Sequence, residues 1–186
     1  MKLYIKNMVC KRCIMYVQEV LIKNKIGFKC VELGEAETLE EISKEKYAAI
    51  EKDLKASGFE LLSDSKTILI EKIKKVIIEM IHYFEERPIV NYSEYIATKL
   101  NHDYHSLSTL FSKIKGMTIE QYIIAQKIEK VKEFLSYDDL TLTEIAYKLN
   151  YSSVAHLSKQ FKKVTGLSPT FFKSSNSSKR KSLDDI

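Results

Sequence analysis

The sequence predicts an α+β protein, in which a small mixed N-terminal domain precedes an all-helical domain. Three observations support this prediction. The first 62 residues alternate short strand-like runs with helical patterns, helical periodicity dominates from residue 67 onward, and the stretch at 93–116 recurs within 140–173. Only five glycines and two prolines occur in 186 residues, which also favours long helices.

Changes in pattern and polarity divide the chain into four predicted segments. They are a mixed domain at 1–63, a hinge and connecting helix at 64–88, a helical domain at 89–173 and a disordered tail at 174–186. The tail is polar and has no apolar periodicity, which is typical of disorder.

The net charge of +5 is unevenly distributed along the chain. Residues 1–63 carry 11 Lys and Arg against 10 Asp and Glu, whereas residues 89–186 carry 14 against 10. The positive excess therefore lies in the helical half, where a nucleic acid would bind.

Composition and motifs also predict where the protein works and what it does not do. Three cysteines, an odd number, argue against a disulfide framework, and we expect no signal peptide and no membrane span. The expected location is cytoplasmic, with reduced thiols. No glycine-rich phosphate loop, HExxH sequence or nucleophile elbow is present, so we do not expect an enzyme.

The N-terminal domain has the element order β-α-β-β-α-β, a ferredoxin-like arrangement. Alternation of Leu3 and Ile5 with polar neighbours predicts the first strand. The remaining predicted elements are a helix after the loop at 7–13 to about Asn24, strands at 28–33 and 35–38, a helix over 39–57 and a strand at 59–62.

The loop at 7–13, NMVCKRC, contains a CxxC sequence before the first helix. We expect the helix dipole and the cations Lys11 and Arg12 to lower the pKa of the thiols of Cys10 and Cys13. Two soft thiolates suit Cu(I), or Zn(II) with additional ligands. Cys30, on the second predicted strand, is expected to be a small buried residue, with a third-ligand role as the alternative.

This arrangement resembles the heavy-metal-associated domain of metallochaperones and copper pumps. The Met and both Cys positions of that family's G-M-T/S-C-x-x-C loop match Met8, Cys10 and Cys13, whereas Asn7 and Val9 depart from it. The resemblance implies a soft-metal site at Cys10 and Cys13. A redox dithiol, or a loop with neither role, remains an alternative.

After a polar hinge at 63–66, a single helix is predicted from Thr67 to Glu86, ended by Arg87-Pro88. Its apolar residues extend beyond one stripe, which indicates contacts with more than one neighbour.

The stretch 140–173 has the pattern of a helix-turn-helix. Thr141 and Glu144 fit a capping box that starts a short helix, Asn150 suits a left-handed turn, and a second helix follows a cap at Ser152 or Ser153. Residues 93–116 repeat this pattern, with an offset of 49 residues before the turn and 50 after it. Between the copies, Thr118 and Gln121 predict a capped linker helix to about Ser136.

Residues 67–173 resemble the DNA-binding domain of the AraC/XylS family of bacterial transcription regulators. The positions that match the family pattern of the second copy are Ile145, Ala146, Phe161, Lys162, Gly166, Ser168, Pro169 and Phe172. The clearer departures are Asn150 for Gly, Ala155 for Ser, and Lys159 and Lys173 for Arg. Because Lys lacks the bidentate fork of Arg, Lys159 is expected to contact phosphate more readily than bases.

The resemblance implies two recognition helices, at 103–115 and 153–164, and a set of DNA-binding residues. In the first helix they are His105, Ser108, Thr109, Ser112 and Lys113. In the second they are Ala155, His156, Lys159, Lys162 and Lys163. Lys115 and Lys127 are further candidate phosphate contacts.

The sequence therefore predicts a sequence-specific DNA-binding transcription regulator, controlled by a soft metal ion at the CxxC loop. The implied partner is double-stranded DNA, and RNA polymerase and a homodimer are left open as further partners. A redox-responsive regulator, or a metal-trafficking protein with a helical partner domain, is the alternative.

Overall fold

The structure, a computed structural model, describes residues 1–83, 91–137, 140–174 and 183. The chain divides into two compact units, one formed by Met1–Val76 with Val90–Leu110 and the other by Ile77–Ile89 with Phe111–Ile186. Among the described residues, no helix is both long and apolar enough to span a membrane. The predicted tail lies outside the described residues from 175 onward, apart from residue 183.

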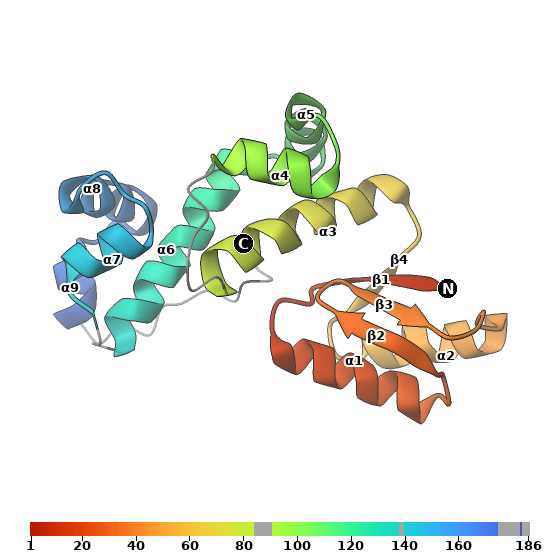
Figure 1. Ribbon diagram of the computed structural model, residues 1–186. Coiled ribbons are helices and arrows are strands. Elements are labelled where there is room, and N and C mark those ends of the chain that lie inside the picture. Colours follow the sequence, from red (N-terminus) through yellow and green to blue (C-terminus); the bar gives the residue numbers. More distant parts are fainter. Residues whose placement is uncertain (84–90, 138–139, 175–182, 184–186) are drawn as a thin grey trace. The chain divides into compact units, whose positions relative to one another are not determined.

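A four-stranded antiparallel sheet and two helices form the N-terminal part (Figure 1). The strands lie in the order β2-β3-β1-β4, so that β2 and β4 are the edges. The elements are β1 (Lys2–Lys6), α1 (Lys11–Lys23), β2 (Phe28–Glu32), β3 (Glu35–Thr38), α2 (Lys44–Lys55) and β4 (Glu60–Leu62). This is the succession of strands and helices that the sequence predicts.

The core of this part lies between the sheet and the helices α1 and α2. The alternation in β1 places Leu3 and Ile5 in this core, at 2% and 1% exposure. Val17 and Leu21 of α1 and Ile50 of α2 belong to the same cluster. Lys2, Tyr4 and Lys6 consequently face the opposite side of the sheet.

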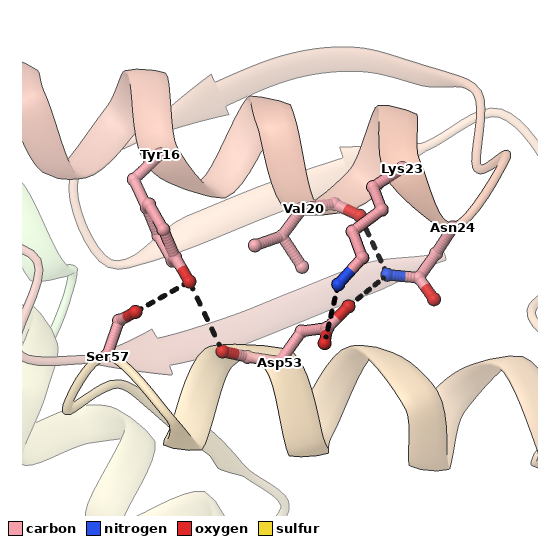
Figure 2. Close-up of polar contacts among 6 residues, drawn as sticks. All are labelled: Tyr16, Val20, Lys23, Asn24, Asp53 and Ser57. Carbon is pink, nitrogen blue, oxygen red and sulfur yellow. Dashed lines mark hydrogen bonds and ion pairs between the residues drawn. The ribbon is translucent and has the colours of Figure 1, made fainter.

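A polar cluster centred on Asp53 joins α1 to α2 (Figure 2). Its carboxylate pairs with Lys23 at 3.0 Å and accepts a hydrogen bond from the side-chain amide of Asn24 at 2.9 Å. The Tyr16 hydroxyl accepts from Ser57 at 2.6 Å and donates to the Asp53 carbonyl at 3.3 Å. These bonds fix the helix that follows the cysteine loop against α2.

The second helix begins later than predicted, at Lys44 rather than at residue 39. Ser43 caps it, with its hydroxyl accepting a hydrogen bond from the Lys46 backbone N–H. The preceding residues continue the sheet region instead, because the backbone N–H of Leu39 bonds the carbonyl of Gly27 at 2.9 Å. Apolar periodicity alone does not reveal this competing backbone partner.

The rest of the described chain is helical (Figure 1). The elements are α3 (Ser65–Ile78), the π-helix η1 (Glu79–Tyr83), α4 (Tyr92–Leu100), α5 (Tyr104–Lys115), α6 (Ile119–Tyr137), α7 (Leu142–Lys148), α8 (Val154–Thr165) and α9 (Pro169–Ser174). The linker helix, the two helix pairs and the capping box of Thr141 with Glu144 occur where the sequence predicts them.

The long helix predicted from Thr67 begins at Ser65 and changes character before its expected end. Asp64 starts it by accepting hydrogen bonds from the backbone and hydroxyl of Thr67, at 2.8 and 3.0 Å. From Glu79 the backbone continues as a π-helix. The predicted end at Glu86, Arg87 and Pro88 lies outside the described residues.

Candidate nucleic-acid interface and cysteine loop

The two helix pairs, α4–α5 (the first helix pair) and α7–α8 (the second), turn in the same way. Asn101 and Asn150 both have a left-handed backbone, with φ of 52° and 55°. Residue 102 donates its backbone N–H to the Ala97 carbonyl at 3.1 Å, and residue 151 donates to Ala146 at 2.9 Å. The turns therefore match bond for bond at an offset of 49, as the repeat predicts.

Beyond the turns, the two pairs match at an offset of 50. Asp103 accepts a hydrogen bond from the Ser106 backbone N–H at 2.9 Å, and Ser153 accepts one from the His156 backbone N–H at 3.1 Å. Each side chain thus caps its helix. Gly116 and Gly166 end the helices with left-handed φ values of 69° and 79°.

The match extends into the following helix, which the sequence comparison of the two copies does not include. The rings of Phe111 and Tyr122 lie 5.6 Å apart, and those of Phe161 and Phe172 lie 5.5 Å apart. Both pairs are separated by the same 50 residues. The start of α6 therefore corresponds to α9, and in each copy an aromatic pair joins the end of the second helix to the helix that follows.

The predicted contact residues of the second pair share one exposed stripe of α8. Spacings of four, seven and eight residues from Ala155 place Lys159, Lys162 and Lys163 on that stripe, and all four are exposed, as is His156. None of the three lysines has an ion-pair partner within the described part of the chain. Since α8 contains no Asp or Glu, the stripe is positively charged.

The predicted residues of the first pair are less uniformly available. His105, Thr109 and Lys113 are exposed on α5, whereas Ser108 and Ser112 are half-buried. The pKa of Asp103 is lowered, mainly because its carboxylate accepts hydrogen bonds from the backbone and hydroxyl of Ser106. α5 itself contains no acidic residue.

The prediction that Lys127 contacts a phosphate is wrong. Lys127 is only 9% exposed, and its ammonium lies over the Tyr151 ring at 5.1 Å from the centroid. Burial and this cation–π contact leave its ammonium little surface for a phosphate. The helical periodicity of α6 predicts that Lys127 lies near the core. It does not predict the contact with Tyr151, which is 24 residues away in the sequence.

The sequence also does not indicate how the His156 ring is held. Its Nδ1 lies 3.0 Å from the Ser152 hydroxyl, and the ring meets Tyr151 edge-on at a centroid distance of 5.3 Å. The Tyr151 hydroxyl in turn donates to Gln160 Oε1 at 2.7 Å. The only sequence signal for this arrangement is the four-residue spacing of Ser152 and His156.

The cysteine loop is anchored on both sides of its first residues. Asn7 has a left-handed φ of 70°, and its side-chain amide donates to the Gly58 carbonyl at 2.8 Å. Asn tolerates this left-handed conformation better than most residues. Met8 is buried in the core at 5% exposure. Cys10 then occupies the N-cap of α1, and the Cys13 backbone N–H donates to its carbonyl at 3.0 Å.

The two thiols of the loop lie together, with Cys10 Sγ and Cys13 Sγ 3.4 Å apart and both residues half-buried. The prediction of a lowered thiol pKa is wrong for Cys13, whose pKa is raised, mainly because burial disfavours the thiolate. Hydrogen bonds from the backbone of Val9 and Cys10 oppose this effect only in part.

Cys30 is exposed on the edge strand β2, so the prediction that it is buried is wrong. Inward and outward positions on an edge strand cannot be assigned from a five-residue run whose register is irregular at 28–30. Within the described ranges, no group of three His, Cys, Asp or Glu side chains could hold a metal ion. Cys10 and Cys13 therefore stand as a pair.

The helical part is similar to known regulators. Residues 96–175 match the model of a helix-turn-helix domain family. The HTH-type transcriptional regulator YtdP of Bacillus subtilis (strain 168) is 28% identical over 99 residues, which are 53% of this chain and 13% of that protein. The Tn10 TetD protein of Escherichia coli is 24% identical over 119 residues, 64% of this chain and 84% of that protein.

Among solved structures, the C-terminal domain of AraT, a response regulator from Geobacillus stearothermophilus, matches with a TM-score of 0.51. It is 22% identical and covers 64% of this chain and 92% of that chain, which shows a shared fold. The chain spans 13% of the length of YtdP. Residues 96–175 therefore match a helix-turn-helix domain family, and the helical part shares its fold with the AraT domain.

Proposed function

We propose that the protein is a sequence-specific DNA-binding regulator that reads DNA with α5 and α8. The observation that carries the proposal is the duplicated scaffold, in which two acid-free helices are capped, turned and closed by equivalent bonds. A helix-turn-helix uses its second helix to enter the major groove, so a duplicated unit suits two successive groove segments.

The side chains on α8 suit contact with the DNA backbone. Lys159, Lys162 and Lys163 would neutralise phosphates and release condensed counterions. The shorter residues Ala155 and His156, and His105 and Thr109 on α5, would approach base edges. Since neither helix carries Arg, a large share of affinity would come from phosphates and DNA shape.

Titration of labelled DNA from upstream of the protein's own gene tests this function. Fluorescence anisotropy over a salt series is expected to give a specific complex whose affinity falls steeply with salt, and unlabelled duplex RNA is expected to compete poorly. Equal affinity for upstream and random DNA would exclude sequence-specific regulation. Absence of any complex would favour the metal-trafficking alternative.

We further propose that the N-terminal part, with its ferredoxin-like arrangement, binds a soft metal ion through Cys10 and Cys13. Support comes from the element and strand order and from the half-buried thiol pair. Two thiols are enough for Cu(I), which soft thiolate ligands favour. Zn(II) would need two more ligands and, at a Zn–S length of about 2.3 Å, a tetrahedral sulfur separation of roughly 3.8 Å.

Helix α3 provides the connection from the sheet toward the DNA-binding part. The Lys72 ammonium lies 4.8 Å from the centroid of Tyr4 on β1, and Lys75 pairs with Glu32 of β2 at 3.1 Å. β1 leads directly into the cysteine loop, so the route that we propose from the loop to α3 runs through Tyr4. Metal would alter DNA affinity only if it binds two arrangements of α3 unequally.

Competition titration with a Cu(I) chelator tests the metal site without reference to DNA. The wild type is expected to take up one Cu(I) per chain, and Cys10→Ser and Cys13→Ser are expected to lose it. Cys30→Ser is the matched control and is expected to retain uptake. Equal uptake by all four proteins would exclude this site.

The 3.4 Å sulfur separation also suits a redox switch as a second candidate for control. Hydrogen peroxide would take two electrons and two protons from the two thiols, which form one S–S bond while peroxide becomes water. Mass spectrometry of the thiols after mild peroxide treatment, with DNA affinity measured in parallel, distinguishes the two controls. A disulfide that leaves DNA affinity unchanged would exclude redox control.

A further inference from the structure

We propose that His156 is the base-discriminating side chain of α8, and that Ser152 and Tyr151 position its imidazole ring for this role. The inference rests on the proposed DNA-binding function and adds to it the residue that gives specificity. On α8, one exposed but restrained ring stands beside three exposed lysines.

The His156 ring is restrained from two directions, although the residue as a whole is exposed. Ser152 Oγ lies 3.0 Å from Nδ1, and the Tyr151 ring stands perpendicular to the imidazole, at 89°. Tyr151 is itself fixed, because it is 8% exposed and its hydroxyl donates to Gln160 at 2.7 Å. The Lys127 ammonium over the Tyr151 ring adds a further restraint.

With Nδ1 engaged, Nε2 is the ring nitrogen available to a ligand. In the proposed reading state, the Ser152 hydroxyl donates its hydrogen to Nδ1, which lies 3.0 Å away. Nε2 then carries the ring proton and donates, and it also donates in the doubly protonated ring. In the major groove the matching acceptor is N7 of a purine.

A restrained donor differs from a flexible ammonium in what it can distinguish. The lysines have long, rotatable side chains without a described ion-pair partner, and they can follow a phosphate at any sequence. The His156 ring loses little further freedom on binding, so a misplaced acceptor is not accommodated by rotation. Discrimination should therefore depend on His156, and general affinity on the lysines.

The first helix pair has no counterpart of this reader. At the 50-residue offset, His156 corresponds to Ser106, whose hydroxyl bonds the capping carboxylate of Asp103 at 3.1 Å. The hydroxyl of Ser106 is thus used inside the helix start. The half of the site under α8 should consequently carry the stronger purine requirement.

The experiment uses the full chain and begins with selection of a preferred site from random duplex DNA. Affinity is then measured for that site and for duplexes in which each purine is replaced singly by its 7-deaza analogue, which lacks the N7 acceptor. One position under α8 is expected to lose about fivefold or more in affinity, within the usual effect of one lost base contact.

The variants separate positioning from folding. His156→Ala is expected to abolish the 7-deaza effect, Ser152→Ala to reduce it, and Ser152→Thr, which restores the hydroxyl, to retain it. His102→Ala is the matched control, because His102 is an exposed histidine outside the proposed contact set, and it should leave the effect intact. Circular dichroism melting checks that each variant folds, since a merely structural loss would not act at one base position.

The outcomes distinguish this inference from the function on which it rests. If the wild type selects no site over random DNA, the proposed function and the inference both fail. If it selects a site but no purine is sensitive to 7-deaza replacement, or sensitivity persists in His156→Ala, the inference alone is overturned. If Ser152→Ala keeps full sensitivity, the positioning role of Ser152 is overturned.

Discussion

The first and second helix pairs have the same internal bonds but present different surfaces. Asn turns, side-chain caps, terminal glycines and aromatic pairs recur at offsets of 49 and 50 residues. Outward, α8 carries three lysines without a described ion-pair partner and a restrained histidine, whereas α5 carries Lys113, half-buried Lys115 and an exposed His105. Folding thus constrains the bonds within each copy, while DNA binding can differentiate the helix surfaces.

Removal of the buried aromatic rings should have the largest effect and should affect both copies alike. Phe111 and Phe161 are each 0% exposed and pack against a second ring. Phe111→Ala and Phe161→Ala are each expected to cost about 3–5 kcal/mol of unfolding free energy, through lost burial and a cavity. Urea unfolding followed by circular dichroism measures both.

Phe171→Ala is the matched control, because Phe171 adjoins Phe172 but is 57% exposed. It is expected to change the unfolding free energy by less than about 0.5 kcal/mol. If Phe111→Ala proved as mild as this control, the two copies would not be equivalent in their cores.

Removal of the exposed lysines should separate the copies. Each lysine that neutralises a phosphate adds about 0.9 to the slope of log affinity against log salt. Replacing Lys159, Lys162 and Lys163 with Ala should reduce the magnitude of this slope by about 2.7. If the variant and the wild type bind equally at 1 M salt, the variant should bind roughly 500-fold more weakly at 0.1 M salt. Lys113→Ala, with one contact, should lose only about eightfold.

The matched control for this charge change lies in the N-terminal part. Lys6, Lys23 and Lys29 form ion pairs with Glu60, Asp53 and Glu37, so their replacement removes the same charge from a different surface. That triple variant should leave the salt slope unchanged. An equal fall in slope would show that net charge alone, not the α8 stripe, governs affinity.

The turns offer a smaller test of equivalence. Asn101→Ala and Asn150→Ala should each lower the free energy of unfolding by about 1–2 kcal/mol, because the Cβ of alanine is sterically strained in the left-handed conformation. The corresponding Gly variants should be nearly neutral, since glycine has no Cβ. Chemical unfolding compares the four variants. A large cost in only one copy would contradict the matching turn bonds.

Much of this scaffold could be predicted from the sequence because the relevant interactions are local. A capping box needs residues three apart, and a left-handed turn needs Asn or Gly, so Thr141, Glu144 and Asn150 predict their roles directly. The internal repeat extends that prediction to Asn101. The succession of strands and helices follows from periodicity in the same way.

The errors concern partners that are distant in the sequence. Leu39 is excluded from α2 by a backbone bond to Gly27, Lys127 is buried by a contact with Tyr151, and the pKa of Cys13 responds to burial more than to the helix start. The exposure of Cys30 depends on its place at a sheet edge. Local pattern contains none of these long-range contacts.

The helix caps supply the smallest predicted effect, which is present at neutral pH and is lost in acid. α5 is capped by the carboxylate of Asp103, whereas α8 is capped by the Ser153 hydroxyl. The pKa of Asp103 is lowered below the usual value of about 3.9 by hydrogen bonds from Ser106. The stabilisation is therefore fully present above that usual value and is lost as the pH falls through the lower, folded-state pKa.

Replacing the carboxylate cap with a hydroxyl should remove this pH dependence from the first helix pair. Asp103→Ser keeps an acceptor for the helix N–H groups, so the variant should be slightly less stable than the wild type at pH 7 and equally stable once Asp103 is protonated. The reverse change, Ser153→Asp, should introduce a matching acid sensitivity into the second pair. Thermal unfolding at pH 7 and at steps below pH 4 measures both differences. A difference between Asp103→Ser and the wild type that stays constant with pH would show that the cap acts through its geometry and not through its charge.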